Sequence, residues 1–335
     1  MKNNFWKNRK IFITGIDGFV GSNLAKALIQ NGSKVYGLVK DKKKESLLKY
    51  EKLINKCKIY KGDIKDKKIL SNIIKKNKVE VCFHLAAQPE VGIANKDPYN
   101  TWETNIKGTY NLLETIRDNK KHIKSIIIAS SDKAYGDYPK KDLPYREDYH
   151  LKPRYPYDVS KACADMISKA YTTELFNLPI IITRFSNIYG PGQLNFSTIF
   201  PDAIRCIIKN KKFIPRSDGK DFRDFIFIKD IVDVYLLLAR KLYFKPSLSG
   251  EVFNAGNNKP ITVKNLLQKI YFHQNKKTEY LEIVKLMKNK NTTGEIKFQS
   301  MNYRKLNKFF RWKPKYNIEK SLNITFAWYR KYLNK

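Results

Sequence analysis

Two short stretches of the chain hold side chains that could move protons in opposite directions. In ASSDKAYG, Asp132 is followed at once by Lys133, directly after an apolar run. In PYDVSK, Tyr157 and Lys161 are four residues apart, so they share one face of a helix. A carboxyl can act as an acid, and a lysine or a phenolate as a base, when the surroundings shift their pKa values. Adjacent charges in a loop are also common as solvated pairs, so the Asp132–Lys133 pair has two readings.

The tyrosine needs a cationic setting before it can act as a base. A phenol has an ordinary pKa of about 10, which makes it a poor base at neutral pH. The Lys161 ammonium and a cationic nicotinamide ring would both favour the phenolate. Tyr157 would then take a hydroxyl proton while hydride leaves the same carbon. The Tyr-xxx-Lys spacing is frequent by chance in a lysine-rich chain, so this hypothesis depends on a cofactor loop upstream.

Such a loop is present near the start of the sequence. Residues 11–21 read IFITGIDGFVG, in which Gly15, Gly18 and Gly21 follow a predicted strand and open a predicted helix. Glycine allows the backbone to approach a ligand closely, and the helix N-terminus offers free N–H groups to a pyrophosphate. The alternative is a tight strand–helix turn without a ligand. The position of the loop on the first strand of a βαβ series favours the cofactor.

The end of the second strand decides between NAD and NADP. An acid there would bind the ribose hydroxyls of NAD, but the sequence reads Val39, Lys40, Asp41. Asp41 could serve with a small change of register, whereas Lys40 would suit a 2′-phosphate. We predict NAD, with NADP as the alternative.

The elements that must position these residues alternate along the first half of the chain. Short apolar runs predict strands at 11–14, 34–39, 58–61, 81–85, 125–130 and 180–184, and amphipathic stretches predict helices at 18–30, 67–77 and 99–119. This pattern predicts an α/β fold, a Rossmann-type doubly wound parallel sheet with a smaller C-terminal substrate lobe. We assign residues 1–185 plus about 225–250 to the dinucleotide-binding lobe, and 186–224 plus about 251–335 to the smaller second lobe.

Composition limits the partners and the compartment. The formal charge is +35, but the lysines are spread along the chain and accompany no nucleic-acid recognition motif, so we expect a solvated basic surface and no specific nucleic acid. No apolar run is long enough to span a bilayer, and no signal peptide is recognisable. The four cysteines lack metal or disulfide spacing. We therefore predict a cytoplasmic protein without a metal site and without a membrane partner.

Six motifs in order resemble the extended short-chain dehydrogenases/reductases: TGIDGFVG, HLAAQ, SSDKAYG, PYDVSK, RFSNIYGPG and RDFIFIKD. Within that group the chain looks most like the nucleotide-sugar 4,6-dehydratases, and closest to the CDP-glucose branch. The resemblance covers nearly the whole chain. It implies a Rossmann lobe, a smaller lobe for the sugar nucleotide, and a homodimer formed through two helices.

The resemblance also implies a reaction. The sugar is oxidised at C4, water leaves across C5–C6, and hydride returns to C6. Most of these dehydratases carry Asp-Glu at the elimination site, and the CDP-glucose branch resembles this chain in carrying Asp-Lys. Asp132 would be the general acid, Lys133 would handle the C5 proton, and Ser131 would polarise the C4 oxygen beside Tyr157. Lys133 could alternatively stabilise the enolate while a water takes the proton.

Further residues follow from the same resemblance. Those predicted to contact the cofactor lie in the glycine loop, after the third and fourth strands and at the Tyr–Lys pair: Gly15, Asp17, Gly18, Phe19, Val20, Gly21, Asp63, Ile64, Leu85, Ala86, Ala87, Tyr157 and Lys161. Those predicted to bind the substrate are Gln88, Ser131, Asn187, Asn195, Arg216 and Arg223. Two other functions stay open. One is an epimerase on the same fold, which has less need for Asp132 and Lys133, and the other is a non-catalytic nucleotide- or nucleic-acid-binding protein.

Overall fold

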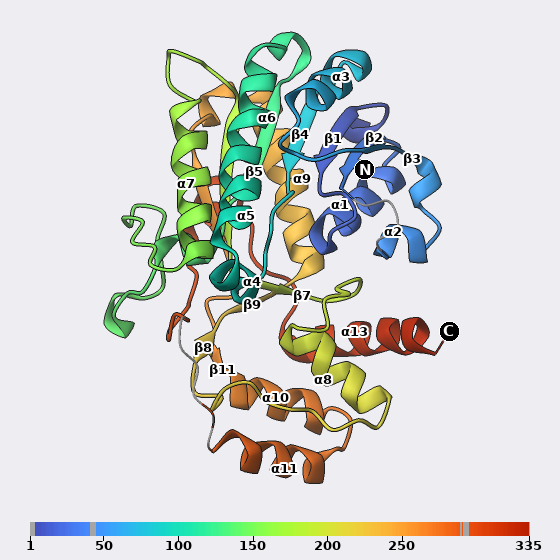
Figure 1. The fold of residues 1–335 in the computed structure, drawn as a ribbon, viewed down its shortest axis with the longest axis vertical. Coiled ribbons are helices and arrows are strands. Elements are labelled where there is room, and N and C mark those ends of the chain that lie inside the picture. Colours follow the sequence, from blue (N-terminus) through green and yellow to red (C-terminus); the bar gives the residue numbers. More distant parts are fainter. Residues whose placement is uncertain (1–3, 41–44, 289, 291–294, 335) are drawn as a thin grey trace. The chain divides into compact units, whose positions relative to one another are not determined.

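The structure is a computed structural model that describes residues 4–40, 45–288, 290 and 295–334. The chain divides into two compact units, each made of three segments (Figure 1). The first unit comprises Met1–Gly136, His150–Arg184 and Val232–Phe253, and the second comprises Asp137–Tyr149, Phe185–Ile231 and Asn254–Lys335. The units are described separately.

A seven-stranded sheet forms the first unit. Its strands are β1 (Lys10–Thr14), β2 (Lys34–Val39), β3 (Cys57–Lys61), β4 (Val81–His84), β5 (Ser125–Ala129), β6 (Ile180–Phe185) and β10 (Val252–Ala255), in the order β10-β6-β5-β4-β1-β2-β3. The pairings from β3 through β6 are all parallel. Six strands were predicted to within one residue at each end, and the short β10 was not predicted.

Both faces of this sheet are covered by helices, because its central strands are apolar on both sides. The helices of the first unit are α1 (Phe19–Gln30), α2 (Leu47–Tyr50), α3 (Lys67–Asn77), α4 (Val91–Lys96), α5 (Pro98–Trp102), α6 (Gly108–Arg117), α7 (Pro156–Ala170) and most of α9 (Ile228–Phe244). On one face, Leu70 of α3 and Leu112 of α6 share a core with Phe12 of β1. On the other, Phe83 of β4 meets Tyr235 of α9 at a ring-centroid distance of 6.1 Å. The predicted α/β class with a doubly wound parallel sheet is confirmed.

The register brings the carboxyl ends of the central strands to one edge. Thr14 at the end of β1 pairs with His84 at the end of β4, and His84 pairs with Ile128 in β5. Ligands of doubly wound sheets bind at this edge. One five-residue π-helical turn, Glu103–Lys107, separates α5 from α6. Such turns occur often at functional sites.

Among its described residues, the second unit contains two small sheets and five complete α-helices. Strand β7 (Asn187–Tyr189) pairs in parallel with β9 (Phe225–Phe227), and β8 (Phe222–Arg223) pairs antiparallel with β11 (Ile261–Thr262). The helices are α8 (Ile199–Ile208), α10 (Val263–Phe272), α11 (Lys277–Met287), α12 (Arg304–Phe310) and α13 (Ile318–Leu333).

The division into units differs from the predicted boundaries at residues 137–149 and 225–231. The predicted boundaries place both stretches in the first lobe, whereas the structure groups them with the second unit. In the structure Tyr145 N donates to Ser300 O at 2.8 Å, and Asn302 N donates to Tyr145 O at 3.1 Å. These backbone bonds add residues 137–149 to the second unit.

Candidate active site

The turn after β1 has no space for side chains at two of its glycines. Gly15 has φ +68°, and a Cβ there would lie 2.9 Å from both Cα and N of Ala86. A Cβ on Gly21 would lie 2.2 Å from the Gly15 carbonyl oxygen, whereas one on Gly18 would lie 3.2 Å from it. Helix α1 therefore begins directly against this turn. The first N–H groups of any helix lack intrahelical acceptors, so the turn has the form that a pyrophosphate requires.

The other residues predicted to contact the cofactor lie in the first unit, after β1, β3 and β4. They are Asp17, Phe19, Val20, Asp63, Ile64, Leu85, Ala86 and Ala87. The Ile64 side chain is 5% exposed and belongs to the core, so any contact it makes with a ligand comes from its backbone.

The end of β2 carries a lysine that pairs with an acid on the neighbouring strand end. Lys40 Nζ lies 3.3 Å from Asp63 Oδ2, and Lys65 N donates to Asp63 Oδ1 at 3.0 Å. Burial raises the pKa of Asp63, but the Lys65 hydrogen bond and the Lys40 charge outweigh it, so the pKa lies below its usual value. Asp41, the alternative ribose-binding acid, lies outside the described residues.

The Asp132–Lys133 stretch forms a short 3₁₀ helix, η5 (Asp132–Tyr135), after β5. Ser131 is its N-cap: the hydroxyl accepts from Lys133 N at 3.2 Å and donates to Asp132 Oδ1 at 3.0 Å. Asp132 is only 3% exposed, whereas Lys133 is partly exposed. A solvated surface pair would leave both charges in water, so the burial of Asp132 argues against that reading.

Gly136 fixes the far end of this turn. Its φ is +75°, and a Cβ there would lie 1.8 Å from the Lys152 carbonyl oxygen. Lys152 N in turn donates to Tyr135 O at 3.1 Å. The turn is therefore bound to the residues that precede α7.

Tyr157 lies in the first turn of α7, after Pro156 at the first helical position, where a missing N–H costs nothing. Burial raises the pKa of Tyr157 and the nearby Asp132 raises it further, although a side-chain hydrogen bond with Ser131 opposes both. At neutral pH the free protein therefore holds a phenol here, and a cation must be added before the phenolate forms.

Lys161 lies one turn further along α7 and is 6% exposed. Its Nζ donates to the carbonyl of Ala129 at the end of β5. Burial lowers the pKa of Lys161 to about 8, although Asp165 opposes the shift. The lysine thus connects α7 to the strand from which the acid–base turn begins.

A buried arginine in β6 connects this strand to α7 and to η5. Arg184 donates to both carboxylate oxygens of Asp165 in α7, at 2.7 and 2.9 Å, and to the Tyr135 hydroxyl of η5 at 2.9 Å. All three side chains are at most 5% exposed. Arg184 is a charged residue in the otherwise apolar strand 180–185, which indicates a buried partner of opposite charge, but the sequence analysis did not predict this ion pair.

Gln88 follows β4, and its amide is hydrogen-bonded to its own loop and to α5. Nε2 donates to Glu90 O at 3.0 Å and to Thr101 Oγ1 at 3.1 Å, while Oε1 accepts from Glu90 N. A sugar would have to replace one of these bonds.

The other residues predicted to bind substrate lie in the second unit, and two of them share a loop contact. Asn195 Oδ1 accepts from Ser197 N and Oγ, and Arg216 Nη1 donates to Ser197 O at 2.8 Å. Asn187 Nδ2 donates to Asp224 O at 3.2 Å. These bonds hold each side chain near a backbone turn.

Arg223, the predicted diphosphate ligand, already has anionic partners. It is 7% exposed, and its Nη2 lies 2.7 Å from Glu295 Oε2 and 3.4 Å from Asp221 Oδ2. Binding of a diphosphate would require exchange of at least one carboxylate.

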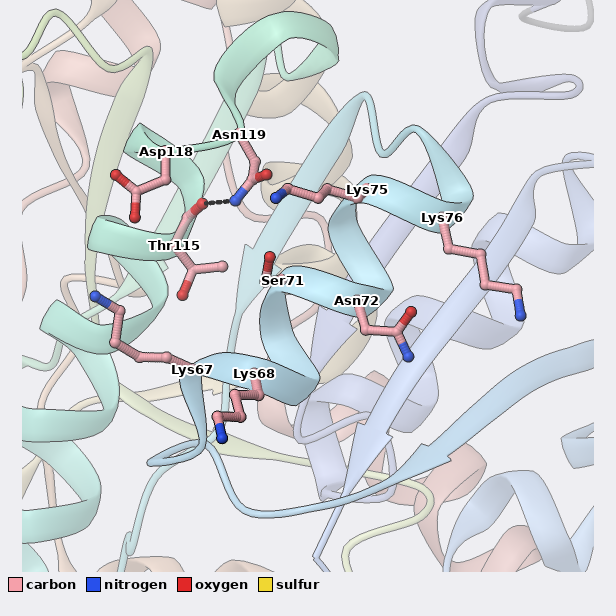
Figure 2. Close-up of a pocket in the computed structure, with 9 residues that line it drawn as sticks. All are labelled: Lys67, Lys68, Ser71, Asn72, Lys75, Lys76, Thr115, Asp118 and Asn119. Carbon is pink, nitrogen blue, oxygen red and sulfur yellow. Dashed lines mark hydrogen bonds between the residues drawn. The ribbon is translucent and has the colours of Figure 1, made fainter.

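A large surface groove of about 770 Å³ lies elsewhere in the first unit, between α3 and the end of α6 (Figure 2). None of the predicted site residues lines it. Its lining side chains are mostly basic or polar: Lys67, Lys68, Ser71, Asn72, Lys75, Lys76, Thr115, Asp118 and Asn119. The open, lysine-rich lining fits the predicted solvated basic surface.

The described residues contain neither a membrane-spanning helix nor a cluster of metal ligands. No helix there is both long and apolar enough to cross a membrane. No group of three or more His, Cys, Asp or Glu side chains within the described ranges is arranged to hold a metal ion.

Comparison with known proteins gives the family. The profile of the family described as GDP-mannose 4,6 dehydratase matches residues 12–325. The chain belongs to this family. That assignment confirms the resemblance to the nucleotide-sugar 4,6-dehydratases.

Two curated relatives of this family member are dehydratases. A dTDP-D-glucose 4,6-dehydratase of Dictyostelium discoideum is 35% identical over 280 residues, which are 78% of the chain but only 61% of that relative. A CDP-glucose 4,6-dehydratase of Salmonella typhimurium is 28% identical over 341 residues, covering 98% of the chain and 93% of the relative. The chain thus spans less than two thirds of the length of the first protein and nearly all of the second.

Solved structures of the same fold include dehydratases and epimerases. The dTDP-glucose 4,6-dehydratase of Bacillus anthracis, crystallised with NAD, has a TM-score of 0.81 at 30% identity and covers 96% of this chain and 97% of its own. The UDP-glucose 4-epimerase of Thermotoga maritima, crystallised with UDP-glucose, has a TM-score of 0.82 at 26% identity, with coverages of 97% and 99%.

Proposed function

We propose that this protein is an NAD-dependent nucleotide-sugar 4,6-dehydratase, with a CDP-glucose-like NDP-hexose as substrate. The observation that carries the proposal is the environment of Asp132. Its carboxyl is buried beside the Ser131 hydroxyl, and Ser131 also bonds Tyr157. An epimerase needs the Ser131–Tyr157 pair, but a buried acid next to that pair suits the loss of a hydroxide.

The turn after β1 fits the proposed cofactor. Side chains at Gly15 and Gly21 would collide with the backbone of Ala86 and of Gly15, so glycine there lets the strand end, the turn and α1 pack closely. The first N–H groups of α1, which lack intrahelical acceptors, are proposed to bind the pyrophosphate. NAD, when bound, accepts a hydride and later returns it. The Bacillus anthracis dehydratase, which shares this fold at 30% identity, was crystallised with NAD, which supports NAD over NADP.

Each acid–base group then has a role that its environment supports. Tyr157 takes the proton of the C4 hydroxyl once the positive charges of Lys161 and the nicotinamide offset the burial of its phenol. Ser131 holds the C4 oxygen. Asp132 protonates the leaving C6 hydroxyl, because its buried carboxyl lies beside Ser131 and, through Ser131, beside Tyr157. Lys133 handles the C5 proton, directly or by stabilising the enolate.

The sugar nucleotide is proposed to be bound by Gln88 in the first unit and by residues of the second. Those residues are Asn187, Asn195, Arg216 and Arg223. The guanidinium geometry of Arg223 suits two phosphate oxygens. The Asp132–Lys133 pair, which resembles the CDP-glucose branch, supports cytidine as the base, and a CDP-glucose 4,6-dehydratase is among the relatives that match almost the full chain. Mass spectrometry of reactions with CDP-, GDP-, UDP- and dTDP-hexoses tests this: we expect loss of water from the CDP sugar first. Unchanged mass with a shifted sugar configuration would favour the epimerase.

Mutation should separate the two half-reactions. Tyr157→Phe should block reduction of the cofactor, whereas Asp132→Asn should still reduce it and stall before water is lost. Lys133→Ala should stall at the same stage and slow exchange of the C5 hydrogen with solvent. Acid–base groups contribute on the order of 10² to 10⁴ in rate. Single-turnover absorbance of the reduced nicotinamide, paired with deuterium uptake by the sugar, measures both steps.

The chain offers a matched control for these variants. Lys141 and Asp142 are also an adjacent lysine–acid pair, and both are exposed. Lys141→Ala and Asp142→Asn should change neither step. If Asp132→Asn and Lys133→Ala dehydrate substrate as fast as this control pair, the Asp132–Lys133 pair takes no part in elimination and the epimerase becomes the better proposal.

We also propose a cytoplasmic homodimer. Large apolar side chains are exposed on neighbouring helices of the first unit: Ile93 of α4, Tyr99 and Trp102 of α5, Tyr110 of α6 and Met166 of α7. Exposed apolar side chains on neighbouring helices are typical of a protein–protein interface, which supports a dimer. All four cysteines are free thiols, which supports a reducing compartment. Light scattering after chromatography should give a dimer, and Tyr99→Glu with Met166→Lys should give a monomer.

A further inference from the structure

A histidine lies at the end of an otherwise apolar central strand. His84 closes β4, which is paired on both sides by β1 and β5, and its side chain is 4% exposed. Both ring nitrogens have partners: Nδ1 lies 2.9 Å from Thr14 Oγ1, and Nε2 lies 3.0 Å from Thr109 Oγ1. No proton-transfer role in the proposed reaction falls to this residue.

The partners of Thr14 fix where the protons lie on one side of the ring. Its hydroxyl oxygen accepts from both Leu85 N and Ala86 N at 3.1 Å. A hydroxyl has two lone pairs and one proton, so the remaining proton of Thr14 must go to His84 Nδ1. Nδ1 is therefore an acceptor and carries no proton.

The other side of the ring gives the same answer independently. The Thr109 hydroxyl donates to the Asn105 carbonyl at 2.6 Å, so toward His84 it can only accept. Nε2 must then carry the proton. The two sides agree on a neutral imidazole with the proton on Nε2.

Beyond Thr109 the hydrogen bonds continue to the helix of Tyr157. Asn105 lies in the π-helical turn, and its Nδ2 donates to Gln88 O at 3.1 Å and to Ser160 Oγ at 2.9 Å. Asn105 Oδ1 accepts from Gln88 N at 2.8 Å, and Ser160 Oγ donates to Tyr157 O at 2.7 Å. Every one of these residues is in the first unit.

We infer that His84 is a positioning residue: through Thr14 and Thr109 its neutral ring joins the backbone beneath the cofactor loop to the segment that holds Gln88 and Tyr157. One end of the connection is the Leu85–Ala86 backbone, against which Gly15 packs. The other end is the first turn of α7. A displacement of the Leu85–Ala86 backbone is transmitted to the first turn of α7, because each group in this series of hydrogen bonds has a fixed role as donor or acceptor.

The surroundings keep the ring in this state. Burial lowers the pKa of His84 to about 3, and the nearby Lys161 ammonium lowers it as well. A second proton on the ring would leave the Thr14 hydroxyl facing an N–H donor, and the connection would break. An apolar residue of similar size would fill the space but join nothing.

The first test reads the ring directly. In ¹⁵N-labelled protein without substrate, we expect His84 to show a protonated Nε2, an unprotonated Nδ1 and no titration between pH 5 and pH 9. A ring that carries its proton on Nδ1, or that titrates near pH 6.5, overturns the inference. This measurement uses only the wild-type protein, so it does not depend on the folding of a variant or on the proposed reaction.

The second test asks whether the two ends are coupled through His84. Thr14→Val and Thr109→Val each remove one hydroxyl with little change of shape, and Thr14→Ser and Thr109→Ser are the matched controls that keep it. We expect NAD affinity to fall at least fivefold in each valine variant and to return to within twofold of wild type in each serine variant. Because both losses act through one ring, the double valine variant should deviate at least threefold from the product of the single effects. Effects that simply multiply would refute the coupling.

A third test is kinetic, and it depends on the proposed dehydratase function. Thr109→Val should slow cofactor reduction at saturating substrate while leaving the KM for the sugar nucleotide within twofold. If the wild-type protein reduces no cofactor with any NDP-hexose, the proposed function fails, and the ring spectrum and the NAD affinities still decide the role of His84.

Discussion

The lysine in α7 carries an energetic cost that can be measured. Lys161 is buried, and its pKa falls from 10.5 to about 8 on folding. The folded chain therefore binds fewer protons here than the unfolded chain between about pH 8 and pH 10.5, so its stability rises with pH across that window and the full cost is present below pH 8. The shift lowers the free energy of unfolding by about 3 kcal/mol at pH 7. It predicts that the free energy of unfolding rises by about 2 kcal/mol between pH 7 and pH 9.5.

The perturbation is Lys161→Met, which keeps a long side chain and removes the charge. Its absolute stability also includes the lost bond to the Ala129 carbonyl, so the measured quantity is the difference in pH dependence between variant and wild type. Thermal or urea unfolding at constant ionic strength gives that difference. Lys169→Met, at an exposed position of the same helix, is the control and should leave the pH dependence unchanged.

The shift can also be observed without unfolding the protein. With ¹³C-labelled lysine, the resonance that is missing from Lys161→Met should titrate with a midpoint near pH 8. Two results together would refute the idea that burial destabilises the charged form of Lys161. The free energy of unfolding would depend on pH in the same way in wild type and in Lys161→Met, and the Lys161 resonance would titrate with a midpoint above pH 10.

Three further outcomes are expected. Gly18→Val should abolish NAD binding in a folded protein, whereas Gly21→Val should lower the melting temperature, because only the Cβ at position 21 would meet a backbone oxygen at 2.2 Å. Cofactor titration and thermal melts compare the two variants. If Gly18→Val binds NAD as tightly as the wild type, the glycine loop is not the cofactor site. Arg184→Met should lower the free energy of unfolding by roughly 3 to 5 kcal/mol, since it leaves the Asp165 carboxylate buried and unpaired. Adding Asp165→Asn should restore part of that stability. An unchanged melting temperature in Arg184→Met would contradict the role of the ion pair. Duplex DNA should bind weakly, without sequence preference, and be released as salt rises; selective binding at physiological salt, measured by fluorescence anisotropy, would favour the nucleic-acid reading.

The fold was largely predictable because the central strands are short, apolar and separated by clear turn residues. Six strands were found from this pattern, but in VFNA the apolar run is interrupted by Asn254 after two residues and follows a glycine turn, so nothing local distinguishes β10 from a loop. Its strand conformation comes from pairing with β6, which lies about 70 residues earlier in the sequence. The π-helical turn at Glu103–Lys107 was hidden for a similar reason, since the sequence there continues a helical pattern.

The candidate site was predictable where chemistry requires a particular residue type. The glycines, Asp132 and Tyr157 are visible as motifs. The buried polar groups that position them are single residues in apolar segments, such as His84 in VCFH and Arg184 in IIITRF. The sequence shows that such a residue needs a partner, but the partners Thr109 and Asp165 lie on helices 25 and 19 residues away and are identified only by the fold.

The late arrival of β10 has a consequence for the order in which the chain is synthesised. Once β6 has left the ribosome, about 65 more residues must follow before β10 can cover its outer edge. At roughly 5 to 20 residues per second this takes about 3 to 13 s. During that time the run Ile180–Ile182 exposes unpaired backbone groups to other nascent chains. Because most of that interval is spent making residues of the second unit, the first cannot finish folding before much of the second has been synthesised.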